Sequence, residues 1–214
     1  LSLLACAALV TPVLAQKPGE WTRADTLRGS LTAPERTWWD VTFYDLHVAI
    51  SPRDSSIHGS NRISYRVLEP GTVLQVDLKV PLEIDSMVQD GRIVPFHREG
   101  DAFFVTLPEA PGAGDVKTLA IHYHGKPQPA KRPPWDGGFS WGTDSLGRPW
   151  VVTTDQGIGA SIWWPNKDTQ ADEPDSQRVA ITVPKPMVNV SNGRLRSTRK
   201  HKDGTITYEW FVAS

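Results

Sequence analysis

The sequence predicts an all-β domain. Short runs in it alternate apolar residues with others at a period of two, which is typical of half-buried strands. The clearest of these runs are 74–78, 119–123 and 179–183. Pairs that favour tight hairpins separate other strand-like runs, namely Asp90-Gly91, Asn192-Gly193 and Asp203-Gly204. Eighteen prolines and seventeen glycines agree with antiparallel hairpins arranged as a sandwich or an open curved sheet.

Composition limits the classes of partner. The 214 residues are 39% hydrophobic and 22% charged, which is ordinary for a globular protein with one sizeable core. Twenty-three Lys and Arg against twenty-four Asp and Glu give a formal charge of −1. Because no overall field attracts polyanions, we expect neither a nucleic acid nor an anionic membrane as partner.

The first fifteen residues, "LSLLACAALVTPVLA", form an uncharged apolar run that predicts a signal peptide. Val13 and Ala15 satisfy the small-residue rule for cleavage before Gln16, and the run is too short to span a bilayer. The protein is therefore expected to be secreted or periplasmic, and free of the membrane after cleavage. Because the run lacks a preceding Met and basic segment, we expect the leader to be truncated. A buried N-terminal helix is the weaker alternative, since the run has no polar face.

Cys6 is the only cysteine and lies within this leader. "LLAC" at 3–6 also resembles a lipoprotein signal, but lipidation at Cys6 would leave a strongly apolar segment on the mature protein. We favour cleavage after Ala15, which leaves a mature chain with neither a disulfide nor a thiol nucleophile.

Residues 16–40 show little periodicity and are expected to form an extended N-terminal arm, followed by the β domain over 41–214. The sequence stops at "TITYEWFVAS", within an alternating run and without a turn. We therefore expect the natural protein to continue and the domain to be incomplete at its C-terminus.

No catalytic group or metal site can be assigned from the residues. The six histidines never form the H-E-x-x-H spacing of a zinc peptidase. His122 and His124 share one face of an expected strand and could bind a metal only with a third ligand from elsewhere. Their alternation with Leu119, Ile121 and Tyr123 instead indicates a strand with these three residues in the core.

The stretch "DQGIGASIWWPNKDTQADEPD" at 155–175 is the densest candidate region. "GIGASI" lacks the third glycine of a dinucleotide loop, because position 162 is Ile, and no G-x-S-x-G serine motif is present. The spacing of its acidic residues differs from that of an EF-hand calcium-binding loop. We expect a solvated, turn-rich structural loop that contains Asp168, Asp172, Glu173 and Asp175.

Five of the nine tryptophans fall within thirty residues of one another: Trp135, Trp141, Trp150, Trp163 and Trp164. Aromatic rings at this density stack on sugars in carbohydrate-binding modules, and they also dominate interfaces between domains. Composition alone leaves both interpretations open.

Several segments, taken in order, resemble the N-terminal β domain of the aminopeptidase N family of zinc metallopeptidases, the gluzincins. They are "YDLHVAISPRDSSIHGSNRISYRV", "KPQPAKRPPWDGGFSW", "QGIGASIWWPNKDTQADEPDS" and "ITVPKPMVNVSNGRL". The resemblance implies a saddle-shaped, mostly antiparallel sheet that packs on a C-terminal catalytic domain, which binds zinc and acts on peptide substrates. The H-E-x-x-H and G-x-M-E-N motifs of that catalytic domain are absent from this sequence, so the chain alone is expected to bind no cofactor and to be inactive.

The same resemblance implies a substrate-binding segment. In the family, the strand before the WWP-type segment projects a Gln or Glu toward the cleft, where it binds the free amino terminus of the substrate. Alignment on Pro165 places Gln156 there, with Gly157 and Gly159 as residues that permit close backbone approach. An ordinary turn or strand residue is the alternative for Gln156, and Trp163, Trp164 and Pro165 are expected to pack.

Three functions therefore remain open. The first is the N-terminal substrate-cleft and scaffold domain of an exported zinc aminopeptidase. The second is a secreted, Trp-rich carbohydrate-binding module, and the third is a relative whose catalytic domain has decayed into a binding scaffold.

Overall fold

The computed structural model describes residues 22–213, so the expected leader, Cys6 and the cleavage point before Gln16 lie outside the described residues. The described chain begins with two short helices, α1 (Arg23–Leu27) and α2 (Pro34–Thr37). An extended arm was expected here, and that expectation is wrong for these helical turns. Both are anchored by tertiary contacts rather than by helical periodicity, since Leu27 and Arg36 are buried.

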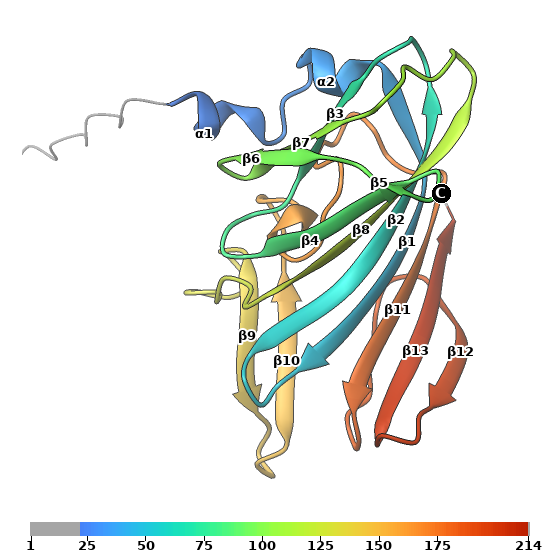
Figure 1. Ribbon diagram of the computed structural model, residues 1–214. Helices are drawn as coiled ribbons and strands as arrows, with labels where there is room; N and C mark the ends of the chain where they lie inside the picture. Colours follow the sequence, from blue (N-terminus) through green and yellow to red (C-terminus); the bar gives the residue numbers. More distant parts are fainter. Residues whose placement is uncertain (1–21, 214) are drawn as a thin grey trace, which may run out of the picture.

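Most strands form one large, strongly twisted sheet (Figure 1). Its eight strands, in spatial order, are β12 (Arg194–Lys200), β13 (Thr205–Ala213), β11 (Ser176–Pro184), β1 (Trp39–Ser51), β2 (Ser56–Val67), β8 (Val116–Gly125), β4 (Glu83–Gln89) and β5 (Arg92–Ile93). Strands β1 and β11 are parallel, whereas the other neighbouring strands of this sheet are antiparallel. The open, mostly antiparallel sheet confirms the expected all-β class.

Two smaller sheets and a 3₁₀ helix complete the described chain. The first sheet contains β3 (Val73–Asp77), β7 (Ala102–Thr106) and β6 (Phe96–Glu99). The second is the hairpin of β9 (Gly138–Thr143) and β10 (Pro149–Thr154), and the 3₁₀ helix is η1 (Ala160–Ile162). Figure 1 shows the three-stranded sheet near α1 and α2, and the β9–β10 hairpin beside the lower part of the large sheet. None of the helices in residues 22–213 has the length and apolar character that crossing a membrane requires.

The period-two alternation places one face of the large sheet in the core. Leu119, Ile121 and Tyr123 of β8 are at most 1% exposed, whereas His122 and His124, on the alternate positions, are exposed. Leu46 and Val48 of β1 alternate in the same way with Asp45 and His47. The runs 119–123 and 179–183 lie within strands, and the prediction that the β8 histidines lie opposite the core is confirmed. The run 74–78 forms β3 as far as Asp77, but it is buried on both faces rather than half-buried, because Gln75 and Asp77 make hydrogen bonds inside the protein.

Two of the three predicted hairpin turns are confirmed. Asp90 and Gly91 have φ values of 51° and 74°, the left-handed pair that a two-residue hairpin between β4 and β5 requires. Asp203-Gly204 lies in the turn between β12 and β13. The prediction at Asn192-Gly193 is wrong, because residues 185–193 form no strand and β12 begins only at Arg194.

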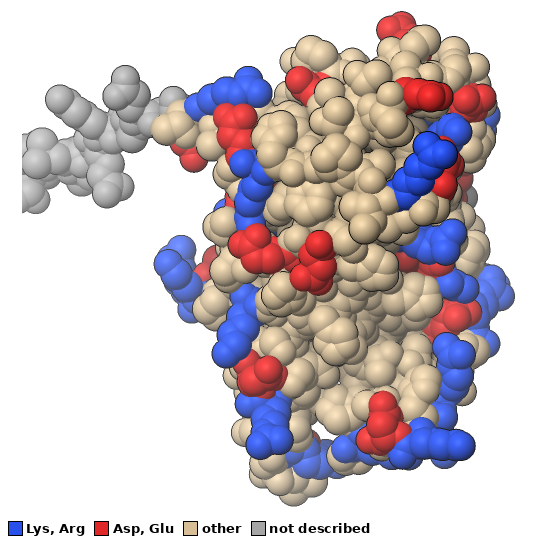
Figure 2. All heavy atoms as spheres, in the orientation of Figure 1, with Lys and Arg blue, Asp and Glu red and all other residues tan. Residues whose placement is uncertain are grey.

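The β12 edge of the large sheet is protected against further strand pairing. All seven residues of β12 are exposed, four of them are Arg or Lys, and the register shifts between Leu195 and Ser197. Charges and bulges of this kind discourage edge-to-edge association. Figure 2 shows charged side chains of both signs, mainly along the margins of the view, around an uncharged centre.

Candidate functional site

The candidate substrate segment begins directly after β10, which ends at Thr154. The backbone N–H groups of Ile158 and Gly159 both donate to the carbonyl of Asp155, at 3.2 and 3.0 Å, and close a tight turn. Gln156 lies exposed at the tip of this turn rather than in the strand before it. Within residues 22–213, the exposed Gln156 side chain makes no hydrogen bond to another residue.

The two glycines of the turn have different roles. Gly157 has a φ of 79°, and a Cβ added there would meet no atom within 4 Å. Gly159 has a φ of 80°, and a Cβ added there would lie 2.1 Å from Oδ1 of Asp168. Close approach is therefore required at Gly159, against Asp168, whereas Gly157 is needed only for its backbone conformation.

Asp168 is the centre of a polar cluster beneath the turn. Its Oδ2 accepts hydrogen bonds from Nη2 of Arg28 at 2.9 Å and from the backbone N–H of Ser161 at 3.3 Å, and also from the Ser161 hydroxyl. Nε of Arg28 donates to the same hydroxyl at 2.7 Å. The side chains of Arg28 and Asp168 are only 23% and 15% exposed. The expectation of a solvated acidic loop is therefore wrong at Asp168.

A buried ion pair lies behind this cluster. The side chains of Arg36 and Asp77 are 1% and 0% exposed and form a direct salt bridge. Asp77 also accepts from Nε2 of Gln75 at 2.9 Å and from the backbone N–H of Asp168 at 3.1 Å. Burial raises the pKa of the Asp77 carboxyl, and the charge and hydrogen bond of Arg36 oppose that rise. The pair joins α2, β3 and the acidic loop inside the protein.

A second ion pair holds the loop from the other side. Nζ of Lys167 binds the Asp172 carboxylate and lies 4.3 Å from the centroid of the Trp39 ring. Asp172 also accepts from the backbone N–H of Val41 at 3.1 Å. Burial lowers the pKa of the Lys167 ammonium, and the hydrogen bond and charge of Asp172 oppose that shift. Asp172 is thus structural, as expected, but fastened to β1 rather than solvated.

The tryptophan cluster separates into packed and exposed members. Trp164 is buried, and Trp141 and Trp163 pack against the main core. Trp135 and Trp150 are 84% and 60% exposed. The expectation that Trp163 and Trp164 pack is confirmed, and two of the five rings remain available for a partner.

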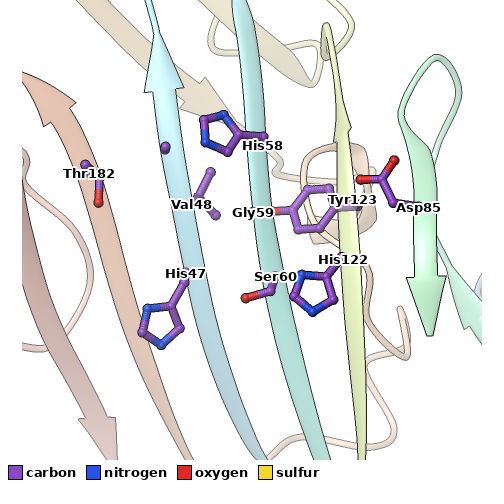
Figure 3. A pocket seen from close by; sticks show the side chains of 10 residues that line it. His47, Val48, His58, Gly59, Ser60, Asp85, His122, Tyr123 and Thr182 are labelled. Atoms are coloured by element: carbon purple, nitrogen blue, oxygen red, sulfur yellow. The ribbon is translucent and has the colours of Figure 1, made fainter. Parts of the chain in front are cut away.

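A separate hollow of about 360 Å³ lies on the large sheet, lined by side chains that include His47, His58 and His122 (Figure 3). These three rings come from neighbouring strands and do not converge on one point. Residues 22–213 contain no group of three or more His, Cys, Asp or Glu that could hold a metal ion, so the described residues do not fit zinc. Neither Gln156, Gly157 nor Gly159 lines this hollow.

The sequence did not identify the two arginines that anchor the candidate segment. Arg28 and Arg36 lie in the non-periodic stretch expected to be an extended arm, and each binds an aspartate at least 41 positions away. No local pattern marks such long-range partners.

No protein-family model and no curated protein matches the sequence. Solved structures match its fold. An M1 zinc metallopeptidase from Deinococcus radiodurans is 21% identical with a TM-score of 0.68, over 83% of this chain and 39% of its own. A mutant of that enzyme bound to a Tyr-Ser-Ala substrate gives 20% identity and a TM-score of 0.65, over 83% of this chain and 40% of its own.

Yeast LTA4 hydrolase is 19% identical with a TM-score of 0.63, over 91% of this chain and 29% of its own. This chain therefore spans about two fifths or less of the proteins that it matches. At such identities the similarity concerns the fold, and the chain has the β fold found in part of these M1 zinc metallopeptidase and LTA4 hydrolase chains.

Proposed function

We propose that this chain is the N-terminal substrate-cleft and scaffold domain of an exported zinc-dependent aminopeptidase of the aminopeptidase N family. Its fold is similar to part of M1 zinc metallopeptidases, one of which is bound to a Tyr-Ser-Ala substrate. The segment resemblances over residues 41–214 support the same family. In this proposal, zinc and the catalytic groups belong to a further domain, and this chain supplies substrate contacts and a packing surface.

The observation that carries the proposal is the contrast within residues 155–172. Polar contacts join this segment to β1, to β3 and to Arg28, which follows α1, whereas Gln156 is exposed at the tip. The residues that make these contacts are Ser161, Asn166, Lys167, Asp168 and Asp172. A side chain on a rigid support loses little entropy when it binds a ligand. The Gln156 amide oxygen can accept a hydrogen bond from a peptide's ammonium group.

The role of this chain's own residues is therefore binding and orientation. An aminopeptidase must hold the free amino terminus at a fixed distance from the reacting bond, and precise placement of this kind supplies much of the rate enhancement. Gln156 is the proposed amine contact. Gly157 and Gly159 give the turn its shape, and the bond-breaking groups are assigned to the other domain.

The exposed Trp135 and Trp150 favour a second candidate, a carbohydrate-binding module. The two candidates differ in a direct test on the purified full-length protein. The aminopeptidase proposal expects about one zinc per chain and hydrolysis of aminoacyl chromogenic substrates that is lost on chelation. A zinc-free, inactive protein that binds polysaccharide, and loses that binding on Trp150→Ala, would support the module instead.

A further inference from the structure

Three residues from two distant parts of the chain meet beneath the turn that carries Gln156. Arg28 follows α1, whereas Ser161 lies in η1 and Asp168 in the acidic loop. Arg28 binds both of the others, with its Nε 2.7 Å from the Ser161 hydroxyl oxygen and its Nη2 2.9 Å from Asp168 Oδ2. These residues lie 133 and 140 positions from Arg28 in the sequence, so the cluster closes a very long loop.

The cluster contacts the turn directly. The Asp168 carboxylate lies against the Cα of Gly159, which leaves no room for a Cβ. Asp168 also accepts from the backbone N–H of Ser161, two residues after Gly159. The polypeptide leaving the turn is therefore held on both sides of Ala160, and Gln156 is only three residues from the held position.

The cluster is itself attached to the protein interior. The backbone N–H of Asp168 donates to the buried carboxylate of Asp77, and the carbonyl of Ser161 accepts from the N–H of Lys79 at 2.8 Å. Both contacts lead to β3 or the residues just after it, next to the main core. The cluster is thus a rigid link between the core and the Gln156 turn.

We infer that Arg28, Ser161 and Asp168 are positioning residues that fix the Asp155–Gly159 turn and thereby set where the Gln156 amide meets a peptide's amino group. This inference rests on the proposed function for the identity of the ligand. The N-terminal segment before β1 then has a role in substrate selection, because it contributes Arg28. If the three residues had only a structural role, they would stabilise the fold without changing the preference for a free amine.

The first arm of the test measures the turn itself, by amide hydrogen exchange in the full-length protein. Arg28→Met and Asp168→Asn should speed exchange at Ile158, Gly159 and Ser161 by roughly tenfold or more, the factor expected for losing a charge-assisted hydrogen bond. The matched control is Arg178→Met. It breaks a similar Arg–Asp pair with Asp45, whose side chains are 36% and 16% exposed, and should leave exchange in the turn unchanged.

The second arm measures amine recognition. Inhibition constants are compared for a peptide and for its analogue without the α-amino group, because only the former can use Gln156. Arg28→Met should reduce the preference for the free amine by roughly 3- to 10-fold, less than Gln156→Ala does. In a Gln156→Ala background, Arg28→Met should change the preference by less than about twofold, because its effect passes through Gln156.

The outcomes separate the two proposals. Faster exchange in the turn together with a preference effect that vanishes in Gln156→Ala supports the positioning role. Unchanged exchange, or the same loss of preference in both backgrounds, overturns it. If amide exchange in the turn rises but Gln156→Ala itself leaves the preference for a free amine intact, the cluster still fixes the turn, and the amine contact assigned to Gln156 is wrong.

Discussion

The carboxylate of Asp168 packs against the Cα of Gly159 so closely that a Cβ there would lie 2.1 Å from Oδ1. Gly159 also has φ 80° and ψ 164°, a backbone region that is essentially restricted to glycine. The conformation of Gly159 therefore allows the partly buried Asp168 carboxylate to pack against the backbone at the base of the candidate site.

This pair gives the first prediction. Gly159→Ala should destabilise the protein by about 3 kcal/mol or more, because it combines backbone strain with displacement of Asp168. Gly157→Ala is the matched control, since Gly157 has nearly the same φ but open space around it, and should cost only about 1–2 kcal/mol. Urea denaturation followed by tryptophan fluorescence measures both. Equal losses would show that the contact with Asp168 contributes nothing.

The Lys167–Asp172 pair gives the second prediction. Asp172→Ala leaves a buried ammonium without its carboxylate and should destabilise the protein by about 3–5 kcal/mol. The control is Glu99→Ala, which removes the partner of Arg23 in a pair whose arginine is 66% exposed, and should cost less than about 1 kcal/mol. A loss at Asp172 no greater than that at Glu99 would contradict the structural role of the acidic loop.

Asp45 gives a prediction about pH. Burial alone raises the pKa of the Asp45 carboxyl, but hydrogen bonds and charges from His47 and Arg178 outweigh burial and lower it below its ordinary value. The folded protein then holds fewer protons at this site than the unfolded chain, so the pair contributes stability above the unfolded pKa of about 3.9 and loses it as pH falls through the lowered value.

The measurement is the free energy of unfolding of the wild type and of Asp45→Asn from pH 6 down to the acid limit of the native state. The free energy of unfolding of the wild type should exceed that of Asp45→Asn by a constant amount above about pH 5, and this difference should shrink below about pH 4. A difference that grows on acidification would contradict the lowered pKa of Asp45.

Local patterns predicted much of this fold. Period-two alternation identified the strands around Leu119 and Val179, and the Asp90-Gly91 pair identified a hairpin, because both signals depend only on adjacent residues. Asn192-Gly193 carries the same signal and is not a hairpin, since residues 185–193 pair with no strand. Turn chemistry permits a hairpin, but strand pairing decides whether one forms.

The candidate site was only partly predictable. Gln156 and the two glycines were named through the family resemblance, but the residues that hold them were not. Arg28 and Arg36 gain their roles from Asp168 and Asp77, which lie far away in the chain, and charge alone suggested a solvated loop. These charged residues form buried or partly buried ion pairs that hold the segment, and burial depends on the whole fold rather than on the local sequence.

Export gives a fourth prediction, which follows from the sequence alone. The exported protein should begin at Gln16, because Val13 and Ala15 satisfy the cleavage rule and the chain becomes polar there. Intact mass and N-terminal sequencing of the protein recovered outside the cytoplasm test this. Recovery with residues 1–15 still attached, or with a lipid on Cys6, would refute it.

The central claim is that Gln156 binds the free amino group of a peptide, and kinetics of Gln156→Ala in the full-length protein test it most directly. A hydrogen bond to a charged group contributes about 1.5–3 kcal/mol, so kcat/KM on aminoacyl substrates should fall roughly 10- to 150-fold. Gln156→Glu keeps an acceptor and should retain far more activity. Affinity for an inhibitor without the amino group should not change. A loss of less than about twofold on the free-amine substrate, within the range of an ordinary surface substitution, would contradict the account.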